Sequence, residues 1–314
     1  MSKLYWMIGL SGSGKSYKAE EIAQKENAII VASDKIRKEL YGDESIQGNP
    51  KDVFYRVNQR IIDYLKIGKN VVFDATNISL KNRGFLFKTL KDNYLHPFNI
   101  AVIMTTPFKI CQKNNRDRGN TVPEEVIRKQ MNKFNIPFFE EGFNAIIFDN
   151  WFNNEIIKKC DFDKYNEFNY SHLLKTLTVM SHFNQKNPHH LYSLGYHCID
   201  TYRVIKKFSD DKALLSATLL HDIGKLATQT IDEDGIAHYY NHANVGCYML
   251  LQNLDLFSLS RVDIINTLFY INYHMYPYNW KNEKIKEKYI KIFGREKFNN
   301  LILLKKIDRI CSMD

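Results

Sequence analysis

The chain has 314 residues, 44% of them hydrophobic, and this length and composition predict two domains with substantial cores. It contains no apolar run of about 18 residues, so we expect no membrane span. It shows no signal-peptide cleavage pattern, and its five cysteines are too dispersed for a disulfide framework, so we expect a cytoplasmic location. The net charge of +9 favours a polyanionic partner such as nucleic acid, with a general bias toward Lys, Asn and Ile as the alternative explanation.

Residues 1–155 alternate short apolar runs with amphipathic segments. Runs rich in Val, Ile and aromatic residues are typical of buried parallel strands, and the segments between them have helical spacing. This alternation predicts an α/β domain whose parallel sheet carries helices on both faces. The expected strands are 4–10, 28–33, 70–76 and 99–106, and the expected helices are 15–25, 52–68 and 79–93.

A glycine-rich motif, GLSGSGKS, occupies residues 9–16 between the first expected strand and the first expected helix. Such a loop wraps nucleotide phosphates with its backbone N–H groups, its lysine reaches the β- and γ-phosphates, and its last hydroxyl holds Mg²⁺. The motif predicts binding of ATP, GTP or another NTP, with Lys15 catalytic and Ser16 a magnesium ligand. The predicted nucleotide-binding residues are Gly9, Ser11, Gly12, Ser13, Gly14, Lys15 and Ser16.

Asp34 and Arg37 follow the second expected strand. The carboxyl ends of strands are where α/β sheets present catalytic groups, and a spacing of three residues puts both side chains on one helix face. Asp34 could act as the base for an attacking hydroxyl, with Arg37 holding an anionic part of the acceptor. The alternative is a helix N-cap aspartate beside a solvent-facing arginine.

Asp74 and Asn77 lie at the end of the third expected strand. Two roles are open for Asp74, which could support Mg²⁺ or orient the acceptor. We predict substrate binding by both residues.

A basic stretch at residues 111–131 contains Arg116 and Arg118. Mobile arginines over a triphosphate neutralise the charge that develops during phosphoryl transfer, as they do in the lids of such enzymes. We predict that both arginines contact the nucleotide and that Arg118 is catalytic. An ordinary solvated loop is the alternative.

Taken together, these motifs resemble the polynucleotide kinase branch of P-loop phosphotransferases. The resemblance rests on residues 9–16, Asp34 with Arg37, residues 74–77, and the arginine lid from Arg118 to Pro123. It implies that Asp34 is the general base, Arg37 a ligand of acceptor phosphate, and Arg118 the lid arginine. Zeta-toxin-like kinases and small-metabolite kinases have similar outlines.

Beyond a polar connector at 156–170, helical patterns dominate residues 171–314, and nine of the ten histidines lie in 172–274. This segregation predicts a second, all-α domain with its own chemistry. One His-Asp pair lies in ATLLHDIGKL, residues 217–226, and other candidate ligands stand where successive helices could bring them together. The candidate metal ligands are His197, His221, Asp222, His242, His274 and Asp308.

This series is identified as the H…HD…H…H…D pattern of the HD superfamily, and it is similar to the HD domains of tRNA nucleotidyltransferases. The resemblance implies a two-metal site with Asp222 bridging and catalytic. One ion would be held by His197, His221, Asp222 and Asp308, and His242 and His274 would complete the second site. Imidazole and carboxylate ligands suit Mn²⁺, Ni²⁺, Co²⁺, Fe²⁺ or Zn²⁺, so the ligands do not choose the metal.

Four further residues near this series are candidates for substrate contact. Lys225 could bind a substrate phosphate or serve as a cation at a helix C-terminus. His189, His190 and His238 are more simply explained as surface residues.

A kinase and a phosphohydrolase would be futile on one substrate position, but they are complementary on the two ends of a broken strand. The resemblance is to bacterial fusions of an HD phosphohydrolase and a polynucleotide kinase, although in those the HD domain comes first. We predict a bifunctional RNA end-healing enzyme that phosphorylates 5′-OH ends and opens 2′,3′-cyclic phosphates or removes 2′(3′)-phosphates. No K-x-D-G motif is visible, so sealing would need a separate RNA ligase. The alternatives are a nucleoside or small-molecule kinase fused to an HD nucleotidase, and a hydrolase of signalling nucleotides.

Overall fold

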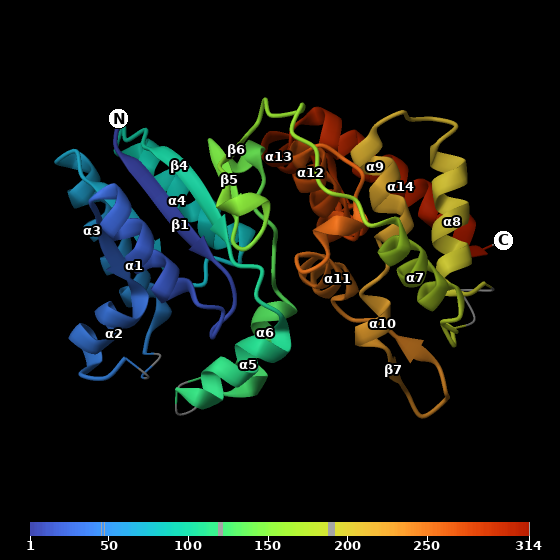
Figure 1. Cartoon of the computed structure of the whole chain (residues 1–314), viewed down its shortest axis with the longest axis horizontal. Coiled ribbons are helices and arrows are strands. Elements are labelled where there is room, and N and C mark those ends of the chain that lie inside the picture. The colour runs from blue at the N-terminus through green and yellow to red at the C-terminus, as the bar shows by residue number, and fades with distance from the viewer. Residues whose placement is uncertain (45, 47, 119–121, 188–191, 314) are drawn as a thin grey trace. The chain divides into compact units, whose positions relative to one another are not determined.

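A computed structural model describes residues 1–313 except 45, 47, 119–121 and 188–191 (Figure 1). The chain forms two compact units. The first contains residues 1–133 and 142–158, and the second contains residues 134–141 and 159–314. Within the described residues, no helix has the length and apolar character needed to cross a membrane.

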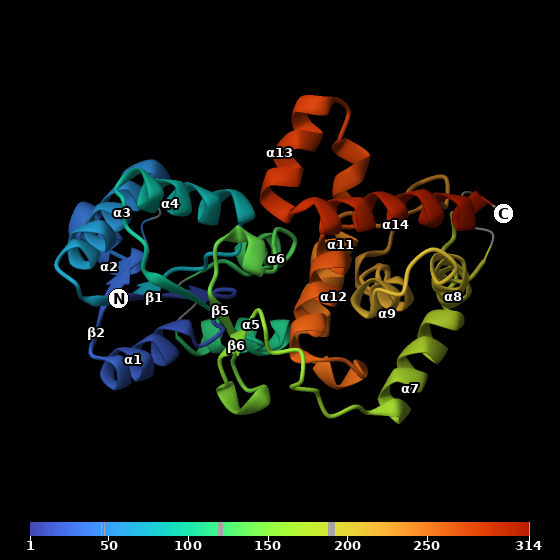
Figure 2. The same ribbon diagram turned by 90° about the horizontal axis from the view of Figure 1, so that it is seen from above.

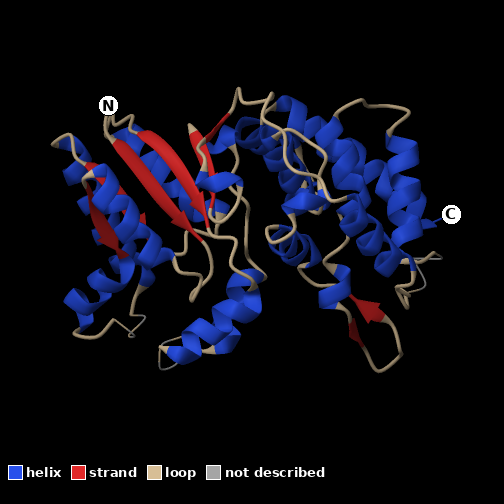
Figure 3. Cartoon of the chain, in the orientation of Figure 1, coloured by secondary structure: helices blue, strands red, loops and turns tan. Residues whose placement is uncertain are grey.

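The first unit is built on a six-stranded sheet in the order β2-β3-β1-β4-β5-β6 (Figure 3). The first five strands are parallel, and β6 pairs antiparallel to β5 at the edge. The four sequence-predicted strands form the centre and one edge of this sheet. The strands are β1 (Lys3–Ile8), β2 (Ala28–Ala32), β3 (Asn70–Asp74), β4 (Phe98–Ile103), β5 (Ala145–Phe148) and β6 (Ile157–Lys158).

Helices cover both faces of this sheet, as the alternating pattern predicts. Figure 2 shows α3 and α4 on one side and α1 on the other. The α3–α4 side includes an aromatic cluster in which Trp6 of β1 stacks on Phe87 and meets Phe143 edge-on. The helices are α1 (Lys15–Glu26), α2 (Ser33–Tyr41), α3 (Pro50–Lys66), α4 (Leu80–Asp92), α5 (Phe108–Asp117) and α6 (Glu124–Met131).

The second unit is almost entirely helical, as predicted, apart from a small antiparallel hairpin of β7 (Thr230–Ile231) and β8 (Ala237–His238). Its core includes the helices at His242–Leu250 and Arg261–Tyr273, most of whose residues are buried. Its helices are α7 (Tyr170–Ser181), α8 (Leu194–Ile205), α9 (Lys212–Leu220), α10 (Lys225–Thr228), α11 (His242–Leu250), α12 (Arg261–Tyr273), α13 (Glu283–Phe293) and α14 (Arg295–Met313).

One segment departs from the division expected at residue 155. Residues 134–141, which end in the short 3₁₀ helix η1 (Phe139–Glu141), belong to the second unit although they precede β5 in the chain. Phe138 is fully buried there and packs against Phe269, Tyr273 and Phe293. The segment joins the second unit because burying its apolar side chains there is favourable, whatever their position along the chain.

Hydrogen bonds to the polypeptide backbone also hold this segment. The Asn272 side chain accepts from the Ile136 N–H at 2.8 Å and donates to the Phe134 carbonyl at 3.0 Å. The Asn244 side chain donates to the same Phe134 carbonyl at 2.7 Å. Because Asn244 lies on α11 and Asn272 on α12, the segment ties these two helices together.

Candidate active sites

The loop between β1 and α1 has the backbone that a phosphate-binding loop requires. Gly12 and Gly14 have φ values of +80° and +88°, where residues with a side chain are strained. A Cβ on Gly12 would lie 2.2 Å from the Cys111 carbonyl oxygen. Lys15 is buried and donates to the Leu10 carbonyl at 2.6 Å. Burial lowers the pKa of Lys15, and the Asp74 carboxylate opposes that shift.

A cavity of about 310 Å³ opens over this loop. Most of the residues predicted for nucleotide and acceptor binding line it. They are Ser11, Gly12, Gly14, Lys15, Ser16, Asp34, Arg37, Asp74 and Arg118. Gly9, Ser13, Asn77 and Arg116 are not among its lining residues.

Asp34 and Arg37 form an ion pair in the first turns of α2. Asp34 makes no capping hydrogen bond, because the N-cap position belongs to Ala32. The Asp34 side chain is 67% exposed, and that of Arg37 is 14% exposed. The carboxylate therefore faces the open cavity while the guanidinium is held beside it, an arrangement that favours the acceptor role over the N-cap alternative.

Asp74 and Asn77 have different environments. Burial raises the pKa of Asp74, while Lys15 and a hydrogen bond from Ser16 oppose the rise. Contact with the predicted magnesium ligand Ser16 favours the Mg²⁺ role for Asp74 over acceptor orientation. Asn77 is buried and donates to the Met7 carbonyl at 2.9 Å, so it joins the ends of β1 and β3.

The two arginines of the predicted lid also differ. Arg118 lines the cavity, whereas Arg116 pairs with Glu124 at 2.5 Å. The tip of the lid, residues 119–121, lies outside the described residues. The sequence did not single out Gln130 of α6, which accepts from the Ser11 N–H at 2.8 Å and donates to the Ser11 hydroxyl at 3.0 Å. No local pattern identifies a contact across 119 positions.

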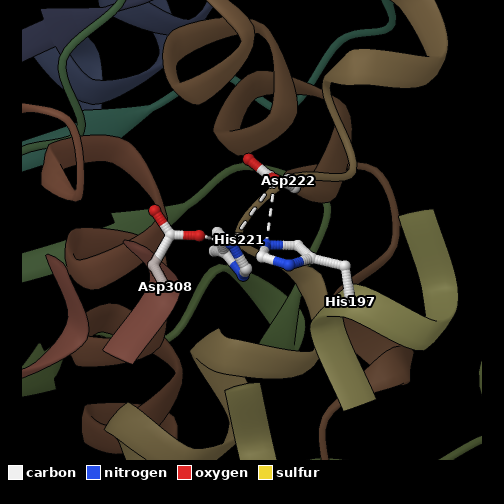
Figure 4. A group of neighbouring side chains, drawn as sticks. All are labelled: His197, His221, Asp222 and Asp308. Carbon is white, nitrogen blue, oxygen red and sulfur yellow. Dashed lines mark hydrogen bonds and ion pairs between the residues drawn. The ribbon is translucent and has the colours of Figure 1, made fainter. Parts of the chain in front are cut away.

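The six predicted metal ligands of the second unit come from five separate segments of the chain and meet in one place. They form two groups, and within each group one ligand atom per residue lies within 4.8 Å of the others. The first group is His197, His221, Asp222 and Asp308, and the second is Asp222, His242 and His274. Figure 4 shows the first group, with its side chains pointing toward one another.

Asp222 belongs to both groups, and its two oxygens divide between them. Oδ2 lies 3.4 Å from His221 Nε2 and 3.7 Å from His197 Nε2. Oδ1 lies 3.1 Å from His242 Nε2 and 3.7 Å from His274 Nε2. A carboxylate with one oxygen toward each group is suited to bridge two metal ions.

The histidine rings are oriented by backbone carbonyls. In three of them Nδ1 lies within hydrogen-bonding distance of the carbonyl three residues earlier, at 2.9 Å for His221, 2.8 Å for His242 and 2.7 Å for His274. When Nδ1–H donates to this carbonyl, the lone pair is on Nε2, the nitrogen that faces the group. This local geometry places three Nε2 atoms ready for a metal.

The pKa values of the ligands differ from one another. Burial opposes protonation of His221, but the Asp222 carboxylate outweighs it and raises the pKa of His221 well above its usual range, so a metal ion would displace a proton from this ring. His221 Nε2 is buried and has no hydrogen-bond partner in the described part of the chain, as expected of an atom that bonds to a metal. Burial, with His242 nearby, lowers the pKa of His274 to about 3, so the ring is neutral. Burial opposes ionisation of Asp222, but Lys225 and His221 outweigh it and hold its pKa well below the usual range. Neutral imidazoles and an ionised carboxylate are the forms that bind metals.

Residues 4–137 match the AAA domain family, and residues 194–313 match the HD domain family. The chain joins a P-loop kinase-like domain to an HD domain. The first implies a nucleotide with Mg²⁺, and the second implies a divalent metal. The predicted order of an α/β domain with a mostly parallel sheet followed by a helical domain is therefore confirmed. A search of curated proteins found no match.

Several solved structures are similar to part of the chain. The Pnkp1/Rnl/Hen1 RNA repair complex has 22% identity and a TM-score of 0.38, over 54% of this chain and 53% of that one. The APS kinase CysC of Mycobacterium tuberculosis has 21% identity and a TM-score of 0.33, over 39% of this chain and 76% of that one. A gluconokinase from Sinorhizobium meliloti has 18% identity and a TM-score of 0.34, over 47% of this chain and 82% of that one.

Gly224 of the HDIGK motif lets two helices of the HD domain meet closely. A Cβ on Gly224 would lie 2.0 Å from the carbonyl oxygen of His242. On the facing helix, a Cβ on Gly246 would lie 2.9 Å from the Gly224 nitrogen. The two glycines therefore allow the backbone that follows Asp222 to touch the start of α11, which brings His242 to the metal site.

Lys225 is buried at the start of α10, where neither predicted role accounts for its contacts. Its Nζ lies 2.7 Å from Asp222 Oδ2, donates to Gln185 at 2.9 Å, and sits over the Tyr239 ring. Lys225 is the first residue of α10, and the preceding helix α9 ends at Leu220. Lys225 holds the Asp222 carboxylate, and both predicted roles stay predictions.

The metal ligands open into a cavity of about 570 Å³. Besides Asp222, His242 and Asp308, it is lined by residues that the sequence did not single out, including Tyr278 and Arg309. Tyr278 donates to Asp308 Oδ2 at 3.0 Å. His238 lines this cavity and pairs with Asp232 at 2.7 Å. His189 and His190 lie outside the described residues.

Proposed function

We propose that the chain is an RNA end-healing enzyme: its kinase-like domain phosphorylates 5′-OH ends, and its HD domain opens 2′,3′-cyclic phosphates and removes 2′(3′)-phosphates. The observation that carries this proposal is the presence in one chain of a cavity over the phosphate-binding loop and two groups of side chains that could hold metal ions. Adding and removing phosphate at one position would cancel. On a broken strand that ends in a 5′-OH and a 2′,3′-cyclic phosphate, both reactions prepare ends for joining.

In the kinase reaction, the 5′-oxygen forms a bond to the γ-phosphorus as the bond to the ADP oxygen breaks. Asp34 takes the hydroxyl proton, and Arg37 holds the carboxylate and an acceptor phosphate. Lys15 and Arg118, which line the same cavity, neutralise charge on the transferring group. Ser16 and Asp74 would hold Mg²⁺. ATP is the expected donor, and GTP or another NTP would occupy the same loop.

In the HD domain, hydrolysis adds one water across a P–O bond of the cyclic phosphate and leaves a monoester and a free hydroxyl. Metal ions bound there would activate the water and neutralise the phosphate. His197, His221, Asp222 and Asp308 would hold one ion, and Asp222, His242 and His274 would hold the other. Mn²⁺, Ni²⁺, Co²⁺, Fe²⁺ and Zn²⁺ all suit this ligand set.

The proposed products define the partners. Healing leaves a 5′-phosphate and a free hydroxyl but does not join them, so a separate RNA ligase completes the repair. The net charge of +9 suits an RNA substrate. We place this activity in the cytoplasm, where RNA and ATP are both present.

Two single-site variants test the division of labour. Lys15→Ala should abolish 5′ phosphorylation and spare hydrolysis of the cyclic end, and Asp222→Ala should do the reverse. The assay supplies 5′-OH oligoribonucleotides and, separately, free nucleosides with labelled ATP. Labelling of nucleosides alone would contradict the proposal, as would one variant that silences both activities in a folded protein.

A further inference from the structure

A second cavity of the kinase-like domain, of about 660 Å³, lies between α3 and α4. It shares Pro50, Phe54 and Asn82 with the cavity over the phosphate-binding loop, so the two cavities are adjacent. Its position is on the acceptor side, because α3 follows the helix of Asp34 and α4 follows the strand of Asp74. The volume is within the range of small-molecule sites.

The walls of this cavity are aromatic. Phe73 and Leu86 are buried and form part of its lining. Tyr55 and Phe85 also line it, yet they are 66% and 62% exposed. Exposed aromatic rings beside a hollow mark a binding surface when they cluster, and a flat π-face is what a nucleobase stacks on.

A polar group inside the cavity points to a ligand with hydrogen-bonding edges. Asn58 is only 5% exposed and lines the cavity. Its carboxamide offers both a hydrogen-bond donor and an acceptor to a ligand in the cavity. Lys51 and Lys81 also line the cavity and carry charge suited to phosphates that flank a base.

We propose that this cavity binds the nucleobase of the acceptor's 5′-terminal nucleotide. Tyr55 and Phe85 stack on the base, Asn58 hydrogen-bonds to its edge, and Lys51 and Lys81 attract the phosphates that follow. The inference rests on the proposed kinase function and gives it a substrate-recognition element. It assigns the cavity to a base attached to a polynucleotide, because the lysines add contacts that a free nucleoside lacks.

The test compares two 5′-OH oligoribonucleotides that differ only in whether the terminal sugar carries a base. Stacking is worth about 1–3 kcal/mol per base, so wild-type KM for the abasic oligonucleotide should be about tenfold higher. Phe85→Ala should raise KM for the base-bearing oligonucleotide about tenfold and leave KM for ATP unchanged. In the Phe85→Ala variant, the difference in KM between the base-bearing and abasic oligonucleotides should be smaller than in wild type. Asn58→Leu, which conserves volume, should also raise KM for the base-bearing substrate.

Tyr94→Ala is the matched control. Tyr94 is an 88% exposed aromatic residue just beyond α4, and it does not line the cavity. Its replacement should leave both KM values unchanged. Equal wild-type KM values for the two oligonucleotides, or no effect of Phe85→Ala, would overturn the inference while the kinase function stands. If wild type labels neither oligonucleotide, the proposed function itself fails and the inference fails with it.

Discussion

Phe138→Ala should destabilise the HD domain, even though Phe138 precedes β5 of the kinase-like domain in the chain. The ring has no exposed surface, and its centroid lies 4.8 Å from that of Phe269 and 5.6 Å from those of Tyr273 and Phe293. Truncating a buried phenylalanine costs about 3–5 kcal/mol through lost burial and the cavity left behind. Loss of three aromatic pairs places the expected cost near the middle of that range, about 4 kcal/mol.

Hydrogen exchange measured by mass spectrometry resolves which unit responds. A loss of about 4 kcal/mol corresponds to roughly thousandfold faster exchange for amides that open with the core. The acceleration should appear in peptides from α11, which begins with His242, and from α12, which His274 follows. Peptides from β1 and β3 should keep their protection. Metal content per chain, measured by elemental mass spectrometry, should fall as the HD domain is destabilised.

Phe143→Ala provides the matched control, since it is the same substitution five positions along the chain. Phe143 is buried in the other unit, with ring centroids 5.5 Å from Trp6 and 5.1 Å from Phe87. It should accelerate exchange in β1 and leave α12 protected. If Phe138→Ala instead exposed β1 and left α12 unchanged, the assignment of residues 134–141 to the second unit would be wrong.

The other predictions concern the HD metal site. Gly224→Ala should lower metal occupancy and stability together, because the new Cβ would lie 2.0 Å from the His242 carbonyl oxygen; unchanged metal content on elemental analysis would contradict this. Lys225→Met should destabilise the metal-free protein by about 3–5 kcal/mol, because it leaves the buried Asp222 carboxylate uncompensated. Added Mn²⁺ should then raise its Tm more than that of wild type, and an equal rise would argue against the pairing. Chelation should abolish hydrolysis in wild type and re-addition of a divalent metal should restore it, whereas activity that survives exhaustive chelation would count against a metal mechanism.

Local sequence patterns predicted the parts of the sites that depend on short spacing. The motif at residues 9–16 fixes a strand, a loop and a helix in succession, so the positions of Lys15 and Ser16 in the cavity follow from it. The HD ligands are farther apart, but each lies in or next to a helix with a clear apolar pattern. Helices of that kind can pack in few ways, and the resemblance supplied the order of the ligands.

Features that depend on distant contacts could not be predicted. Asn77 is a polar residue in a plausible position for substrate binding, yet its side chain joins β1 to β3. Gln130 reaches the phosphate-binding loop across 119 positions. The placement of residues 134–141 depends on aromatic partners more than 130 positions later in the chain. The sequence alone gives no reason to pair those aromatic residues with residues 134–141 rather than with one another.

End analysis of one RNA tests the central claim most directly. An oligoribonucleotide with a 5′-OH and a 2′,3′-cyclic phosphate is incubated with ATP, Mg²⁺ and Mn²⁺, and its ends are identified by mass spectrometry. The account predicts a gain of phosphate at the 5′ end and an opened or phosphate-free 3′ end on the same molecule. A cyclic end that stays intact while a nucleotide is hydrolysed, or a 5′-OH that stays unmodified, would contradict it.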